Sequence, residues 1–273
     1  MSPNGRQHSQ STRLPVAAGD QGAPSKKIAE TNAIFDNIDA ARERARRDPS
    51  CLRISIDGKA KVSIGPFLRR GRARGKASLK ACDHDTQPVA MLRPFGVLEM
   101  ARGEQEIQQL WLAFGHSRET SDFIVDVLEM WWPERRASHP GVCRLQIELD
   151  NGPQLSSSRT QFLKRMQAFA DRYGLEIELV YFPPYHSKYN PIEHCWGALE
   201  QHWNGTLLTT IDTALKWAAT MTWKGLAPIV REVQGIYACG VRVTKAAFRN
   251  IAARIERSAT LPKWHLTIKP LPP

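Results

Sequence analysis

Two segments of the chain share one pattern, and this pattern constrains the fold more than any other feature. In CLRISID (51–57) and CRLQIELD (143–150), apolar residues alternate with polar ones, and each run ends in an aspartate. Such alternation is typical of a β-strand with one face in the core. Asp57 and Asp150 both lie on the face opposite the apolar set. If the two strands are neighbours in one sheet, we expect both carboxylates at the same edge.

The remaining elements predict a sheet covered by helices. Further strands are predicted at 59–67, 95–100, 107–114 and 176–182. Helices are predicted from Thr120 or Ser121, as the capping residue, to Pro133, and over 160–173, where Gly174 supplies the stop. An antiparallel group followed by alternating strands and helices indicates an α/β fold with a mixed sheet.

The charge of the chain favours a polyanionic partner. Its 273 residues hold 38 Lys and Arg against 27 Asp and Glu, a net charge of +11. Six basic residues lie among glycines and other small residues at 69–80, either in a solubilising loop or, as we prefer, in an arm that contacts phosphates. The proposed contacts in this arm are Arg69, Arg70, Arg72, Arg74 and Lys76.

Four classes of protein are disfavoured by the sequence: membrane-spanning, secreted, disulfide-framework and structural-zinc proteins. No window has the length and apolar character of a membrane span, and the first 30 residues lack a secretory signal, so we expect a cytoplasmic protein. The five cysteines are scattered and form no CxxC pair, which argues against a disulfide framework and a structural zinc site. His186, His194 and Cys195 are interpreted as non-ligands for the same reason.

The stretch YFPPYHSKYNPIEHCW (181–196) holds a third carboxylate with two possible roles. Asn190 is a good N-cap, Pro191 suits the first helical position, and Glu193 then completes a capping box. By itself the stretch favours capping. Together with Asp57 and Asp150, however, Glu193 can complete a carboxylate site. Carboxylates at such close range repel one another unless a cation lies between them. Their oxygens suit Mg²⁺ or Mn²⁺. Three carboxylates can form a site for two ions that lie roughly 4 Å apart.

Several residues near these acids have alternative interpretations. Asn151 can orient Asp150 or contact DNA, or it is a turn residue. Three residues precede the predicted helix of Glu193, and they can either contact a phosphate or a base or pack the loop. They are Tyr185, His186 and Lys188.

Other residues are assigned to the framework or to loops. Asp83 and Asp85 form a rival acidic pair that is predicted as a loop feature. Trp196 and Trp203 lie on a helical stripe and are predicted as core. Gly197 either leaves room beside the Glu193 carboxylate or marks tight helix packing.

The segments ISID, LDNGP and FPPYHSKYNPIEHCW resemble the three catalytic segments of DDE transposases of bacterial insertion sequences. The resemblance is closest to the ISAzo-type group and extends to mariner-like enzymes. Glu193 follows Asp150 by 43 positions, a plausible last interval for these enzymes. Flanking segments are also similar over roughly residues 25–268, and they include ACDHD, GHSRETSDFIVD, RTQFLKRMQAFADRYG, HWNGTLL and MTWKG.

This resemblance implies a fold, a reaction and a set of partners. The implied fold is an RNase H-like mixed sheet with flanking helices. Asp57 and Asp150 would hold two Mg²⁺ or Mn²⁺ ions, and Glu193 would complete the second site. The implied reaction is cleavage at transposon ends followed by strand transfer into target DNA. We expect a homo-oligomer on DNA, associated with the bacterial nucleoid.

Composition and periodicity, together with the resemblance, divide the chain. Residues 1–26 are expected to be a disordered tail, 27–50 a helical segment with Thr31 or Asn32 as cap, 51–205 the catalytic domain, and 206–273 a mainly helical extension with an extended end. Related enzymes carry an N-terminal helix-turn-helix, which 26 residues cannot form. A truncated copy is therefore expected, or a binding region encoded elsewhere. A non-catalytic DNA-binding remnant and an RNase H-like nuclease or resolvase remain as alternative functions.

Overall fold

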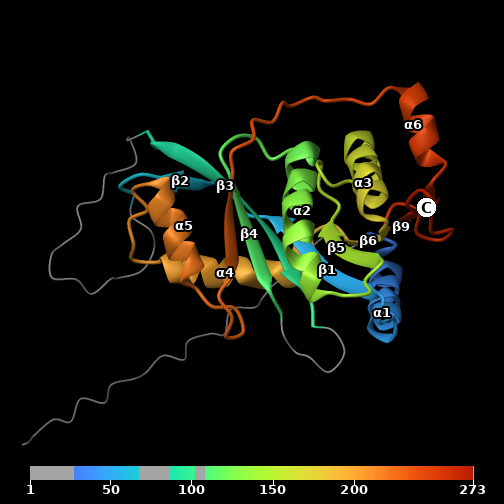
Figure 1. Ribbon diagram of the computed structural model, residues 1–273, viewed down its shortest axis with the longest axis horizontal. Coiled ribbons are helices and arrows are strands. Elements are labelled where there is room, and N and C mark those ends of the chain that lie inside the picture. Colours follow the sequence, from blue (N-terminus) through green and yellow to red (C-terminus); the bar gives the residue numbers. More distant parts are fainter. Residues whose placement is uncertain (1–27, 68–86, 102–107, 273) are drawn as a thin grey trace, which may run out of the picture.

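A computed structural model describes residues 28–67, 87–101 and 108–272 of the chain (Figure 1). The predicted tail, the basic residues Arg69, Arg70, Arg72, Arg74 and Lys76, and the acidic pair Asp83 and Asp85 lie outside these residues. In the described part of the chain, no helix is long and apolar enough to cross a membrane.

In the part of the chain that the structure describes, nine strands form one mixed sheet at the centre. Its order is β7-β4-β3-β1-β5-β6-β9-β8, and β2 pairs with β3 outside this path. The strands are β1 (Cys51–Gly58), β2 (Val62–Ile64), β3 (Ala90–Glu99), β4 (Leu110–Gly115), β5 (Arg144–Asp150), β6 (Glu176–Phe182), β7 (Ile229–Val233), β8 (Ile255–Arg257) and β9 (His265–Ile268).

The five central strands have the RNase H-like arrangement. β4, β3 and β1 are antiparallel neighbours, and β1, β5 and β6 then run parallel to one another. The predicted mixed sheet is therefore confirmed. Because β1, β5 and β6 are parallel, their carboxyl ends meet at one edge of the sheet, and residues that follow these strands lie close together.

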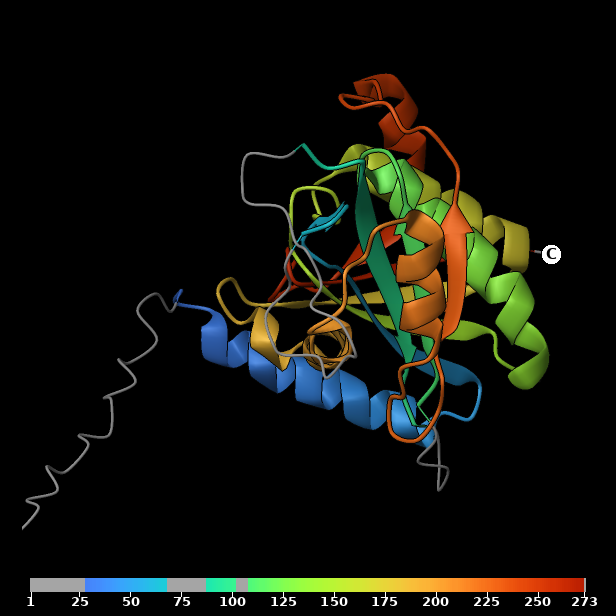
Figure 2. The same cartoon turned by 90° about the vertical axis from the view of Figure 1, so that its left-hand side faces the viewer.

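Helices cover both faces of this sheet (Figure 2). α2 and α3 lie on one face, and α1 and α4 lie on the other; α5 packs beside α4 and β7. The short 3₁₀ segment η1 (Arg136–Ser138) follows α2, and a second one, η2 (Ser187–Tyr189), precedes α4. The helices are α1 (Thr31–Arg47), α2 (Ser121–Arg135), α3 (Thr160–Tyr173), α4 (Pro191–Trp203), α5 (Ile211–Ala219) and α6 (Lys245–Ala252).

The polar face of the central strands is buried, although the alternation in the sequence suggests exposure. Gln146 and Glu148 of β5 have no exposed surface because α1 lies across them. The Gln146 amide donates to the Ala41 carbonyl at 2.7 Å, and Arg42 donates to both Glu148 oxygens at 2.9 and 2.6 Å. Burial of such groups is tolerated only when hydrogen bonds and charges are matched, so these bonds hold α1 on the sheet.

Two predicted helix boundaries are wrong. α2 continues past Pro133 to Arg135, because the Arg135 guanidinium donates to both oxygens of the buried Glu99 at 2.7 and 2.9 Å and holds the last turn. α1 has Glu30 at its N-cap, and Thr31 lies inside the helix with its hydroxyl bonded to the Ile28 carbonyl at 2.8 Å. Neither Thr31 nor Asn32 is therefore the cap.

The C-terminal part is less helical than predicted. Residues 206–272 form α5 and α6, but also three strands that extend the sheet at both sides. β7 pairs with β4, β9 pairs with β6, and β8 pairs with β9. The predicted extended end is confirmed by β9. The mainly helical character is wrong for the β7 and β8 segments. β7 pairs with β4, which lies far away in the sequence, whereas β8 pairs with the neighbouring β9.

Candidate active site

Asp57 and Asp150 leave the sheet at the same edge, as predicted. β1 and β5 pair in parallel, with Ser55 opposite Glu148. Each aspartate lies two residues beyond this pair, near the carboxyl end of its strand. Alternation along the strands then directs both side chains to the face that α1 and α4 cover.

Glu193 brings a third carboxylate to this edge. It is the third residue of α4 and lies in the first turn of the helix. Its negative charge raises the pKa of both Asp57 and Asp150, and Asp150 in turn raises the pKa of Asp57. Coulomb coupling of this kind falls off with distance, so the three acids form one electrostatic group.

Burial and mutual repulsion raise the pKa of both aspartates. Burial, followed by the charge of Glu193, raises the pKa of Asp57 from 3.8 to about 7, although a hydrogen bond from Trp196 lowers it. The same two causes raise the pKa of Asp150 from 3.8 to about 6. Perturbed carboxyl groups at a sheet edge are typical of functional sites, and a bound cation would favour the ionised forms.

The start of α4 is held by β1. The Ser55 hydroxyl donates to Asn190 Oδ1 at 2.5 Å and accepts from the backbone N–H of Ile192 at 3.1 Å. The Asn190 amide donates to the Ile56 carbonyl at 3.2 Å, and its side chain makes no capping bond to its own helix. The predicted capping box is therefore wrong: Ser55, a residue of the sheet, supplies the cap, and Glu193 is left to face the aspartates.

Trp196 has a contact that its place on the core stripe does not reveal. Its indole N–H donates to Asp57 Oδ2 at 3.1 Å, while the residue is 5% exposed. Gly96, opposite Asp57 in β3, makes room for the ring, since a Cβ there would lie 2.9 Å from Trp196 Cη2. The signal available in the sequence is weak: a buried indole N–H needs an acceptor, and Trp196 lies one turn after Glu193.

The donor set fits a divalent cation. Asp150 Oδ1 is buried and has no hydrogen-bond partner among the described residues, which is unusual for a carboxylate oxygen. Oxygen ligands of this type suit Mg²⁺ or Mn²⁺. Within residues 28–67, 87–101 and 108–272, no three acidic, His or Cys side chains are grouped tightly enough to hold an ion as they stand.

The other predicted site residues have varied surroundings. Asn151 Oδ1 accepts the Ser157 N–H at 3.1 Å, which is the contact of a turn residue. His186 is 5% exposed and packs inside its loop, whereas Tyr185 and Lys188 are exposed. Gly197 faces open space, because a Cβ added there would have no atom within 4 Å. Tight packing at Gly197 is therefore excluded, and α4 is open at this position, one turn after Glu193.

Glu119 is a further acid that the sequence analysis did not select. Gly58 follows Asp57, and a Cβ at Gly58 would lie 2.6 Å from Glu119 Oε1. The absence of a side chain at Gly58 therefore lets the Glu119 carboxylate approach β1. Burial raises the pKa of Glu119, and the charge of Arg93 opposes this. No local signal marked Glu119, because it lies in a loop and meets β1 only in the tertiary structure.

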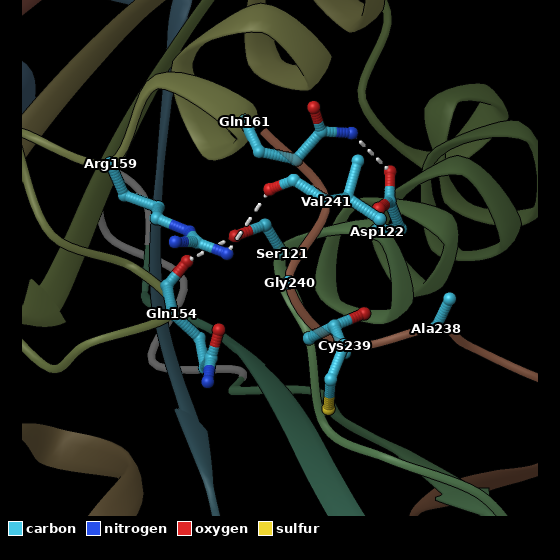
Figure 3. Close-up of a pocket in the computed structure, with 10 residues that line it drawn as sticks. Ser121, Asp122, Gln154, Arg159, Gln161, Ala238, Cys239, Gly240 and Val241 are labelled. Atoms are coloured by element: carbon cyan, nitrogen blue, oxygen red, sulfur yellow. Dashed lines mark hydrogen bonds between the residues drawn. The ribbon is translucent and has the colours of Figure 1, made fainter. Parts of the chain in front are cut away.

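A small cavity lies between the N-terminal ends of α2 and α3 (Figure 3). Ser121, Gln154, Arg159 and Val241 are among its lining residues, and Arg159 donates to the Val241 carbonyl at 3.4 Å. Its volume is about 80 Å³, well below the roughly 300 Å³ of an ordinary small-molecule site. This cavity is therefore too small to enclose a nucleotide.

An RNase H-like sheet with coupled carboxylates at the ends of β1 and β5 and at the start of α4 defines the class as a DDE-type domain. The family model described as "Rhodopirellula transposase DDE domain" matches residues 18–270. The chain therefore belongs to this DDE transposase family.

Solved structures show a weaker similarity. The "Mos1 transposase paired-end complex with left transposon end" matches with a TM-score of 0.49 and 7% identity, over 74% of this chain and 57% of that one. The "Crystal structure of the Mos1 Strand Transfer Complex" matches with a TM-score of 0.47 and 8% identity, over 74% and 57%. The chain thus spans less than two thirds of these proteins. No match was found among curated proteins.

Proposed function

We propose that this protein is a DNA transposase that cleaves DNA at transposon ends and transfers the strands to target DNA, with two Mg²⁺ or Mn²⁺ ions. One observation supports this most strongly. Asp57, Asp150 and Glu193 are charge-coupled at one sheet edge, and Asp150 Oδ1 is buried without a partner among the described residues. In a chain of the DDE family, this is the expected place for the reaction.

Each acid has a proposed role, and neighbouring residues position it. Asp57 and Asp150 would hold the ions, and Glu193 would complete the second ion site. When bound, the two ions would activate the attacking hydroxyl and stabilise the leaving oxygen. Trp196 holds one Asp57 oxygen, which orients the carboxylate. Ser55 fixes the start of α4 and therefore the distance of Glu193 from the aspartates.

The proposed substrate is DNA, both transposon ends and target, bound by a homo-oligomer at the bacterial nucleoid. The net charge of +11 supports a polyanionic partner. Tyr185, Lys188 and Asn151 are proposed DNA contacts near the acids, and His186 packs the loop that carries two of them. The basic residues at 69–80 remain proposed phosphate contacts outside the described residues.

A strand-transfer assay with Mg²⁺ or Mn²⁺ tests this function, with the DNA segments that flank the gene on both sides as the donor. Asp57→Ala, Asp150→Ala and Glu193→Ala should each lower the rate roughly a hundredfold or more, because each removes a charge that the transition state needs. Asp212→Ala is a matched control, since Asp212 also lies in the first turn of a helix but is exposed and pairs with Lys216.

The results separate the alternatives. Activity that persists in all three site variants would exclude the proposed chemistry. DNA binding without cleavage by the unmodified protein would favour the DNA-binding remnant. Cleavage of RNA–DNA hybrids or branched DNA without strand transfer would favour a nuclease.

A further inference from the structure

Tyr185 has a backbone conformation that is uncommon for its residue type. Its φ angle is +64°, and Lys224 is the other non-glycine residue with a positive φ in the described part of the chain. For a bulky L-residue this left-handed conformation crowds Cβ against the backbone. Such a residue persists only where the surrounding structure holds it, and such outliers cluster at functional sites.

The residues around Tyr185 anchor the loop. The His186 N–H donates to the Pro183 carbonyl at 3.2 Å, and the His186 ring donates through Nδ1 to the Pro184 carbonyl at 2.7 Å. The His186 ring also packs edge-on against Phe35 of α1, with 5.5 Å between ring centroids. The loop is therefore held on both sides of Tyr185 by contacts that do not involve the tyrosine ring.

Tyr185 is an exposed residue of this anchored loop. Tyr185 is 74% exposed, while its neighbour His186 is 5% exposed. Tyr189 is 50% exposed, but its ring packs against Phe35 and His186. Lys188, also exposed, lies 5.4 Å from the Tyr189 ring centroid. The surface of this loop thus combines an exposed tyrosine with an exposed lysine three residues later.

The loop lies at the edge of the sheet that carries the acids. Asp150 pairs with Phe182 at the end of β6, and the loop begins at the next residue. It leads directly into α4, whose first turn carries Glu193. Tyr185 therefore lies in the segment that joins the end of β6, opposite Asp150, to the helix that carries Glu193, and we call this segment the rim of the carboxylate site.

The chemistry of this rim selects one kind of ligand. A ring face and a lysine together suit a group that has a π-face and an adjacent negative charge, which is a nucleotide. In duplex DNA the base faces are covered by neighbouring bases, so only an unpaired or extruded base offers its face. We propose that Tyr185 stacks on an unpaired nucleobase beside the carboxylate site, with Lys188 near the adjoining phosphate. This inference rests on the proposed function for the identity of the ligand as DNA.

Fluorescence of 2-aminopurine measures such stacking directly. The unmodified full chain is titrated, in EDTA, against a duplex that carries 2-aminopurine in a single-stranded overhang, and against a fully paired duplex of the same length. The readout is the ratio of the two affinities together with quenching of the unpaired probe. Tyr185→Ala should lower the preference for the unpaired probe roughly tenfold and abolish the added quenching. Tyr185→Phe, which keeps the ring, should retain both.

Two further variants separate stacking from folding. Tyr185→Gly should lose the preference like Tyr185→Ala, yet melt at a higher temperature than Tyr185→Ala, because glycine adopts a positive φ without strain. Lys224→Gly relieves the same kind of backbone strain at the other position with a positive φ in the described chain. Lys224→Gly should leave the ratio of affinities unchanged, since the loss of its positive charge weakens the binding of both probes alike.

Failure of the stacking proposal and failure of the proposed transposase function give different results. An unchanged ratio in Tyr185→Ala, with normal folding, would overturn the stacking proposal even if strand transfer is observed. If Tyr185→Ala lowers the ratio of affinities as expected but the unmodified protein shows no strand transfer, the stacking proposal is retained and the transposase chemistry is refuted. A change in oligomeric state with unchanged quenching would assign the ring to contact between copies of the chain, which also overturns the proposal.

Discussion

Ser55 in β1 and Asn190 at the start of α4 are joined by a 2.5 Å hydrogen bond between two residues with no exposed surface. The two residues are 135 positions apart in the chain. The Ser55 hydroxyl also accepts the Ile192 N–H, so one oxygen caps a helix from a neighbouring strand. This hydrogen bond sets the position of Glu193 relative to Asp57. Asp57 lies two residues after Ser55, and Glu193 lies three residues after Asn190.

Ser55→Ala should therefore destabilise the protein and impair the site. It leaves the Ile192 N–H and the Asn190 oxygen buried without this partner, which costs about 1–3 kcal/mol of unfolding free energy. Urea unfolding measures this cost. Mn²⁺ binding, followed by calorimetry, should weaken roughly 10- to 100-fold. Ser63→Ala is the control, since the Ser63 hydroxyl donates to the Met91 sulfur at 3.4 Å, and a thioether is a weak acceptor. Equal effects of the two variants would contradict the role of Ser55.

Trp196→Phe should change how Asp57 titrates. The indole N–H lowers the pKa of Asp57 by favouring its ionised form, so the phenylalanine variant should have a higher Asp57 pKa. Because a cation competes with that proton, the pH midpoint for Mn²⁺ binding should move upward. The shift is measured by calorimetry at a series of pH values around the Asp57 pKa. Trp203→Phe, in the same helix and also buried, should alter stability but leave this midpoint unchanged.

Stability without a divalent cation should fall as pH rises from about 4 to about 7. The folded protein holds protons on Asp57 and Asp150 above their ordinary pKa of 3.8, so the unfolded chain binds fewer protons in this range. For Asp57, a pKa of about 7 corresponds to about 4 kcal/mol. Asp57→Asn should therefore be more stable than the unmodified protein at pH of about 8 in EDTA, and Mg²⁺ should narrow the difference.

Thermal and urea unfolding at pH values of about 5 and about 8, with EDTA or Mg²⁺, measure this effect. Glu178 titrates in a different window: although burial opposes it, hydrogen bonds from His265, Gln146 and Arg44 lower its pKa to about 2. Its contribution is lost only as pH falls below its ordinary pKa of 4.5. A stability difference between the unmodified protein and Asp57→Asn that does not vary with pH would refute the assigned shift.

The same substitution at two glycines should have opposite effects. At Gly96 a Cβ would lie 2.5 Å from Ile192 Cδ1, so Gly96→Ala should push α4 from the sheet and cost about 1–3 kcal/mol. At Gly197, in α4, a Cβ meets no atom within 4 Å, so Gly197→Ala should add about 0.5–1 kcal/mol. Urea unfolding compares the two. Destabilisation by both, or by neither, would contradict the packing seen at α4.

Much of the framework was predictable because it depends on local patterns. A period of two in 51–57 and 143–150 predicts strands, and Asp57 and Asp150 then share a face. Gly174 does end α3 in a left-handed conformation, as its position after the apolar stripe indicates. The position of Glu193 in the first helical turn follows from Asn190 and Pro191, although the capping role assigned to Asn190 does not.

Local patterns predict the central strands, the helices that pack on them and which three acids could meet at an edge, since periodicity and turn chemistry depend on neighbours in the chain. How the acids are held depends instead on contacts between distant parts of the chain. The bond from Ser55 to Asn190 and that from Trp196 to Asp57 join residues 135 and 139 positions apart. β7 and β9 likewise became part of the sheet through distant partners. Hydrogen bonds of this kind depend on which surfaces pack together, and no local pattern encodes the partner.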